Sequence, residues 1–181
     1  MVSKGIALLL AAQLANMSPA FAQDATQGRA ARPLITEPRN AASGFAVVGW
    51  MTYVDTASQL CANASATAAQ RSRDALAQWQ AHNMAYVEAA FAYMAQVERW
   101  LAIEHGEAAR RQFREDRKRE FTSAVRSAQT TWFPDAVPTE EGCIRFSESL
   151  ASGSLGFDRH AEFFPILKEL KAEAGSTTPT P

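Results

Sequence analysis

The sequence predicts an all-α fold, an antiparallel helical bundle of four to five helices stapled by one disulfide. Three observations indicate this. Alanine is abundant, and long internal segments contain neither glycine nor proline, a composition that favours helices. Apolar residues recur at spacings of three and four, the period of an amphipathic helix, and no segment convincingly shows the pattern of a strand. The chain also contains two cysteines, Cys61 and Cys143, behind an N-terminal segment typical of exported proteins.

Residues 1–22 have the features of a secretory signal peptide. Lys4 provides a positive start, Ile6 to Ala15 form a mostly apolar run, and Ala20-Phe21-Ala22 is a small-residue cleavage pattern. We expect cleavage after Ala22. The apolar run of about ten residues is too short to cross a bilayer, which takes roughly 20. The mature chain is therefore expected to have no transmembrane segment and to be periplasmic or secreted.

The two cysteines are expected to form one disulfide bond. In an oxidising compartment, two lone cysteines are most simply explained as a pair. Neither Cys61 nor Cys143 lies in a C-x-x-C arrangement, and metal ligands at suitable spacing are missing around them. Closing a loop of roughly 80 residues would contribute about 4–5 kcal/mol in the chain-entropy treatment.

Composition along the chain divides the mature protein into three parts. Residues 23–44 contain few large apolar residues and two prolines, so we expect an extended or disordered lead-in. Residues 45–174 carry helical periodicity and are expected to form the bundle domain. Residues 175–181 are expected to be a disordered tail. About 159 residues remain after the leader, enough for one domain with a core.

The first two expected helices are strongly amphipathic. The helix at 45–61 places Cys61 on its apolar face, at its C-terminal end. The helix at 69–104 has an apolar stripe so wide that it is expected to contact two neighbours in a bundle. That stripe is built on Trp79, Asn83, Tyr86, Ala90, Tyr93, Val97 and Trp100.

The second half of the chain predicts three further elements. A turn around Gly106 is expected to start a third helix at 107–130. A joint with two prolines separates it from a short fourth helix at 140–151, which carries Cys143 on its inner face. Asp158 can cap a last segment, in which Pro165 either introduces a kink or marks a new start.

No pattern in the sequence predicts a catalytic or metal site. His82, His105 and His160 are scattered, and no Glu-x-x-His pair, H-E-x-x-H, G-x-S-x-G or glycine-rich phosphate loop occurs. We therefore expect no cofactor and no catalysis, with an enzyme whose site is dispersed over the joints kept as an alternative. A haem carrier is another alternative, since Met51 and His160 could provide axial ligands.

Asn83 interrupts the apolar stripe of the second helix. A buried amide must find hydrogen-bond partners or cost roughly 1–3 kcal/mol. One interpretation is a polar residue that fixes the packing register, as in coiled coils. The other is a ligand cleft around Asn83, with Trp79, Tyr86 and Tyr93 as its walls.

The third helix carries a run of charge. Arg110, Arg114 and Arg117 share one face and could form a ridge that docks a protein or an anionic envelope component. The alternative is a solvated helix with i,i+4 ion pairs such as Arg111–Glu115. Nucleic acid is not an expected partner, because the net charge is −1 and export separates the chain from it.

These observations favour a periplasmic or secreted bundle that acts by binding, as an accessory or interaction protein of the cell envelope. The alternatives are a small-molecule or haem carrier with a cleft around Asn83, and an enzyme with a dispersed site. The sequence leaves the partner and the ligand unknown.

Overall fold

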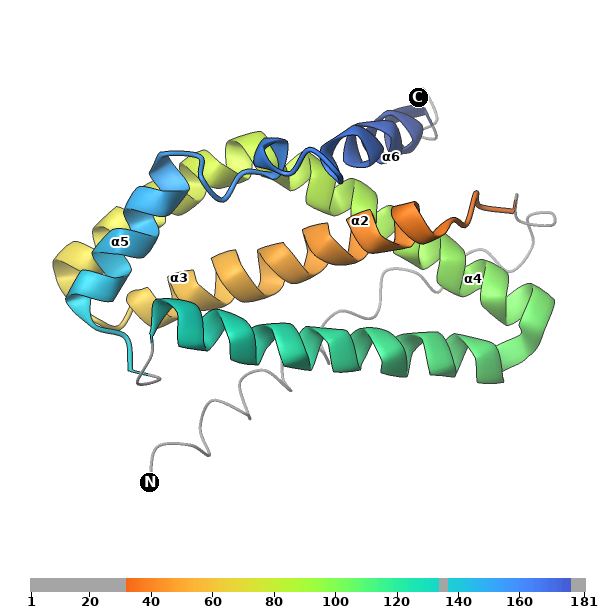
Figure 1. Ribbon diagram of the computed structural model, residues 1–181, viewed down its shortest axis with the longest axis horizontal. Coiled ribbons are helices and arrows are strands. Elements are labelled where there is room, and N and C mark those ends of the chain that lie inside the picture. The colour runs from red at the N-terminus through yellow and green to blue at the C-terminus, as the bar shows by residue number, and fades with distance from the viewer. Residues whose placement is uncertain (1–31, 134–136, 177–181) are drawn as a thin grey trace, which may run out of the picture. The chain divides into compact units, whose positions relative to one another are not determined.

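The architecture comes from a computed structural model, whose described residues are 32–133 and 137–176 (Figure 1). Every regular element within them is helical, which confirms the predicted all-α bundle. The signal peptide at 1–22, the start of the lead-in and the last five residues lie outside this part of the chain. The elements are α2 (Glu37–Val48), η1 (Gly49–Thr56), α3 (Ala57–Cys61), α4 (Ala66–Trp132), α5 (Glu140–Ala151), η2 (Phe157–Arg159) and α6 (Phe164–Ser176).

The first helix begins at Glu37, eight residues before the predicted start. Thr36 is extended and its Oγ1 accepts a hydrogen bond from the backbone N–H of Arg39, as expected of an N-cap. Pro38 lies in the first turn, where a missing N–H costs nothing. Because residues 42–44 are also buried, the prediction of a lead-in up to residue 44 is wrong from Glu37 onward.

α2, η1 and α3 follow one another as a continuous helical segment (Figure 1). The middle part, η1, is a π-helix, the wider helix form that often marks functional or strained sites. The Thr56 hydroxyl donates to the Met51 carbonyl, five residues back, at 2.7 Å. The predicted apolar face persists through this change of winding, since Val54, Ala57 and Cys61 are all buried.

Gly106 divides α4 into two helical halves, as the sequence predicted. Its φ of 81° lies in the left-handed region, which a glycine adopts without strain. The second half runs back from this bend (Figure 1). An ion pair links the halves, with Arg114 Nε 2.7 Å from Glu98 Oε2.

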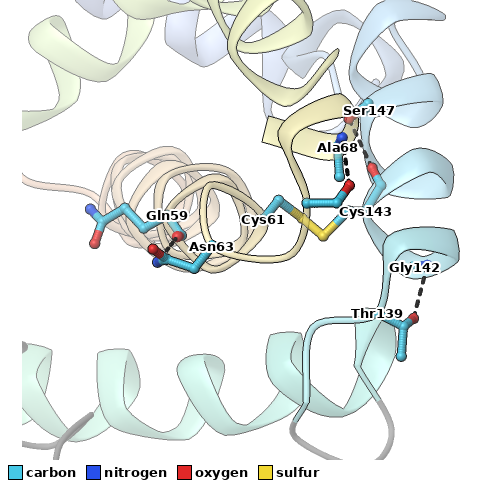
Figure 2. Close-up of a disulfide and its surroundings, with 9 residues drawn as sticks. Gln59, Cys61, Asn63, Ala68, Thr139, Gly142, Cys143 and Ser147 are labelled. Atoms are coloured by element: carbon cyan, nitrogen blue, oxygen red, sulfur yellow. Dashed lines mark hydrogen bonds between the residues drawn. A yellow bond between two sulfur atoms is a disulfide. The ribbon is translucent and has the colours of Figure 1, made fainter. Parts of the chain in front are cut away.

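The disulfide between Cys61 and Cys143 is confirmed (Figure 2). It joins the last residue of α3 to the first turn of α5, with 5.4 Å between the two Cα atoms. α5 has the predicted bounds, and Thr139 caps it by accepting a hydrogen bond from Gly142 N at 3.1 Å. A buried disulfide fits an oxidising compartment. None of the described helices has the length and apolarity needed to cross a membrane.

Residues 152–163, which we call the α5–α6 connection, contain only turns and the short helix η2. α6 then begins at Phe164 with Pro165 in its first turn, so this proline marks a new start and not a kink. Leu167 and Leu170 are buried beneath α6. The helix extends to Ser176, two residues past the predicted end of the domain.

A buried arginine fastens the far end of α6. Arg39 is 5% exposed, and its guanidinium pairs with the Glu173 carboxylate of α6. The same guanidinium lies 5.6 Å from the centre of the Tyr93 ring on α4. A charge this deeply buried needs a partner, and the pair with Glu173 provides one. Arg39 therefore joins α2, α4 and α6.

We predict that replacing both cysteines with serine lowers the free energy of unfolding by about 2–4 kcal/mol, because the unfolded chain gains the entropy of an open loop. Urea unfolding monitored by circular dichroism measures this change. Thiol labelling of the denatured, unreduced protein provides the control, and it should modify neither cysteine. A labelled cysteine or unchanged stability would contradict the structural role of the bond.

A second prediction concerns Asp55, which is half-buried in η1. Burial raises the pKa of its carboxyl, and the hydrogen bond from Gln59 Nε2 at 2.9 Å opposes this only in part. The folded protein therefore binds this proton more tightly than the unfolded chain, whose Asp pKa is about 3.9. The stabilisation is complete below about pH 3.9 and is lost as the pH rises through the raised pKa of the folded state. Asp55→Asn should therefore raise the melting temperature at pH 7 by about 1–4 °C.

A matched control exists on α4, where Gln70 Nε2 donates to the exposed Asp74 at 2.9 Å with the same four-residue spacing. Asp74→Asn should leave the melting temperature nearly unchanged, and the gain from Asp55→Asn should vanish near pH 3. A gain of equal size at both pH values would show that burial of the charge is not its cause.

Candidate functional site

Asn83 is buried on α4, and both ends of its amide are used within the chain. Its Nδ2 donates to the Trp79 carbonyl, and its Oδ1 accepts a hydrogen bond from the backbone N–H of Phe157, each at 3.0 Å. The buried amide thus has the partners that such a group requires. Its bond to Phe157 fastens η2 to α4, 74 residues away in sequence.

A groove of about 350 Å³ opens beside Asn83, between the first half of α4 and the α5–α6 connection. Trp79, His82, Asn83 and Tyr86 line it from α4. The opposite side consists of residues 150–153, Gly156, Asp158, Arg159 and Phe164. Small-molecule sites have volumes of roughly 300–1,000 Å³, so this space, which we call the Asn83 groove, can hold a small ligand.

The aromatic walls of the Asn83 groove are fixed by their neighbours. The Trp79 ring stacks on Trp50 with 5.4 Å between centroids, and its Nε1 donates to the Leu155 carbonyl at 2.9 Å. The Tyr86 and Phe164 rings meet edge to face at 5.5 Å. Aromatic pairs of this geometry are favourable beyond their buried area, so the walls are preorganised.

Two glycines shape the opposite wall. Gly153 has a φ of 72°, a left-handed conformation that most side chains disfavour. At Gly156, an added Cβ would lie 2.5 Å from Asp158 Oδ1 and 3.1 Å from the Gly153 carbonyl oxygen. Both positions therefore favour glycine, which lets the connection turn tightly against α4.

Tyr93 does not line the Asn83 groove, although the sequence placed it there. Its hydroxyl donates to Asn40 Oδ1 of α2 at 2.9 Å, and its ring lies beside the Arg39 guanidinium. Burial raises the pKa of this phenol, and the positive charge of Arg39 partly opposes that rise. Position 93 shares the helical stripe of Asn83 but meets α2, whereas the groove forms against the α5–α6 connection.

The three arginines of the predicted ridge are each paired with a carboxylate of the same chain. Arg110 pairs with Glu107 at 2.7 Å and Arg114 with Glu98 at 2.7 Å. Arg117 pairs with Glu120 at 3.0 Å, and its guanidinium lies 5.3 Å from the centre of the Phe113 ring. The ridge therefore presents neutralised charges.

The pairing differs in detail from the sequence prediction. Arg111 and Glu115 do not form the expected i,i+4 ion pair, and Arg119 pairs with Asp116 instead. Two hydrogen bonds, from Arg119 and Gln112, hold the pKa of Asp116 below its usual value. The exposed cations Arg111 and Lys118 are left without an ion-pair partner among the described residues.

Arg117 also borders a second groove, of about 500 Å³, between α2 and the second half of α4. Ile35, Asn40 and Phe45 line it together with the Arg117–Glu120 pair. The arginine packs closely on α2, because a Cβ added at residue 44 would meet its Nη1 at 2.8 Å. The cation of this groove is thus already neutralised and held in place.

The histidines have separate environments. His82 Nδ1 lies 2.8 Å from the Gln78 carbonyl oxygen. The His105 ring meets Trp100 at 4.8 Å, and the His160 ring meets Phe45 at 4.5 Å. Among the residues described, no three His, Cys, Asp or Glu side chains gather closely enough to hold a metal ion. Neither His160 nor Met51, the conceivable haem ligands, lines either groove.

Sequence reasoning missed the charged side chains around the Asn83 groove. Arg159 lines the groove directly, and Lys168 and Lys171 of α6 lie against two of its aromatic rings. The available signal was the spacing of Phe164, Lys168 and Lys171, which places them on one helical face. The spacing predicts a shared face only if these residues lie in one helix, and that requires knowing that Pro165 lies at the start of a helix.

Comparisons with protein-family models, with curated proteins and with solved structures find no match to this chain.

We predict that Asn83→Ala lowers the free energy of unfolding by about 1–3 kcal/mol, because it leaves the buried backbone N–H of Phe157 without its acceptor. Urea unfolding measures the loss. Gln96→Ala is the matched control, since Gln96 is an exposed amide on the same helix. Equal stability of the two variants would mean that the hydrogen bond does not hold η2 in place.

Proposed function

We propose that this protein is exported to the periplasm or secreted, and that it acts by binding a small molecule in the Asn83 groove without transforming it. The groove places a buried, hydrogen-bonded Asn83 and the aromatic side chains of Trp79, Tyr86 and Phe164 around a space of ligand size. A mostly apolar concavity with a few well-placed polar groups is the usual form of a small-molecule site. The observation that carries the proposal is this groove with preorganised walls.

Binding without catalysis is supported by the hydrogen bonds of the polar lining. A covalent mechanism needs a nucleophile within reach of a base. The Ser152 hydroxyl donates to the Ser149 carbonyl at 3.2 Å, and His82 is engaged with the Gln78 carbonyl. The Ser152 hydroxyl and His82 Nδ1, both in the described lining, therefore contact backbone carbonyls and not each other.

Docking on the arginines of α4 has weaker support. Arg110, Arg114 and Arg117 are all ion-paired, so an anionic partner would have to compete with Glu107, Glu98 and Glu120. Exposed ion pairs are worth up to about 1 kcal/mol each, and that energy would be subtracted from the energy of docking. We therefore place the binding site at the groove.

We predict that protein purified from the envelope fraction of its own host carries a small molecule that native mass spectrometry detects as extra mass. Ala151→Trp should remove this mass, because Ala151 is exposed, lines the groove and ends α5, so an indole there fills the space. Ala77→Trp is the control, at an exposed alanine of α4 outside the groove lining. The mass of the denatured chain also reports whether cleavage follows Ala22.

Three results would count against this function. A wild-type chain without extra mass would remove the evidence for a carrier, and co-purification with another protein would favour docking instead. Retention of the same molecule by Ala151→Trp would place the ligand outside the Asn83 groove.

A further inference from the structure

One cation lines the Asn83 groove and two lie against its aromatic rings, and none of the three is ion-paired within the described chain. Arg159 is exposed and lines the groove. Lys168 Nζ lies 5.1 Å from the centre of the Phe164 ring, and Lys171 Nζ lies 4.7 Å from the centre of the Tyr86 ring. Both rings belong to the groove lining. The lysine charges are therefore held beside the aromatic walls by cation–π contacts and not by carboxylates.

The acidic residues of α6 lie away from this cluster. In helical spacing, Lys168 and Lys171 follow Phe164 by four and seven residues and share its face. Glu169 and Glu173 fall on the other side of α6, and Glu173 pairs with the buried Arg39. Asp158 is the single carboxylate among the residues that line the groove. Within the lining, Arg159 and Asp158 carry opposite charges, so the additional positive charge at the groove comes from Lys168 and Lys171 beside its aromatic rings.

This arrangement contrasts with the arginines on the second half of α4. There, Arg110, Arg114 and Arg117 each have a carboxylate partner within 3.0 Å. The chain thus pairs these three arginines with carboxylates, whereas Arg159, Lys168 and Lys171 have no carboxylate partner among the described residues. An anion that binds at the groove therefore does not have to break an ion pair within the protein, and no ion-pair energy is subtracted from its binding energy.

We propose that the ligand of the Asn83 groove is a small anion with a flat apolar body, of the class of aromatic carboxylates or sulfonates. The body lies against Tyr86 and Phe164, whose rings are partly exposed at the groove, while the buried Trp79 packs behind them. The charged group lies at the rim, where the Arg159 guanidinium can donate two parallel hydrogen bonds to its oxygens. Lys168 and Lys171 add positive charge. This assignment rests on the groove being the binding site.

A pair of fluorescent probes tests the ligand class. 8-Anilinonaphthalene-1-sulfonate and N-phenyl-1-naphthylamine share one ring system and differ by the sulfonate, so their affinities separate the charge from the apolar body. The test variant is Arg159→Gln, Lys168→Gln and Lys171→Gln combined. The control variant combines Arg99→Gln, Arg111→Gln and Lys118→Gln, which removes the same charge from exposed side chains outside the groove lining.

We expect the test variant to raise the dissociation constant of the sulfonate probe about tenfold, since three partly exposed charge contacts are lost. The dissociation constant of the uncharged probe should change by less than about twofold. The control variant should bind both probes nearly as tightly as the wild type does. Added salt should weaken the binding of the sulfonate probe alone, because salt screens the attraction between its charge and the cations. Circular dichroism and melting temperature confirm folding, and the three single substitutions serve if the combined variant is unstable.

The outcomes separate this inference from the proposed function. Unchanged sulfonate affinity in the test variant, while Ala151→Trp still abolishes binding of both probes, would overturn the anion class and leave the groove as a site. Binding of both probes that Ala151→Trp does not affect would overturn the groove itself. Equal weakening by the test and control variants would show an effect of net charge alone and would also overturn the anion class.

Discussion

Two hydrogen bonds from α4 hold the part of the chain on which the candidate site depends. Trp79 Nε1 donates to the Leu155 carbonyl, and Asn83 Oδ1 accepts from the Phe157 N–H. The α5–α6 connection has little regular structure of its own, so these bonds supply partners that a helix would otherwise provide. They set where η2 lies, where α6 starts, and therefore where the cations of the groove are placed.

Much of the helical framework could be predicted from the sequence, because apolar periodicity and turn residues report it directly. The bend at Gly106 and the bounds of α5 follow from these signals. The start of α2 could not be found this way, since Pro38 is equally compatible with a disordered segment and with a first helical turn. The π-helix η1 also escaped prediction, because its side chains keep an apolar face that a regular helix would show as well.

The candidate site was predictable only in part. Asn83 stood out as an amide within an apolar stripe, and Trp79 and Tyr86 do line its groove. The stripe could not tell which neighbour each residue meets, so Tyr93 was assigned to the groove although it contacts α2. The pairing of Arg114 with Glu98 runs across the bend, 16 residues apart, and no local spacing rule predicts such a contact.

The disulfide also changes the cost of assembling the groove. Asn83 and Phe157 are 74 residues apart along the backbone, and their contact must close a loop of that size. The covalent path through Cys61 and Cys143 is roughly half as long. Because each doubling of a loop costs about 0.6 kcal/mol in closure entropy, oxidation makes this distant contact easier to form. Pairing of the two cysteines thus favours closure of the groove, and under the proposed function this would make the site form more readily in an oxidising compartment than in a reducing one.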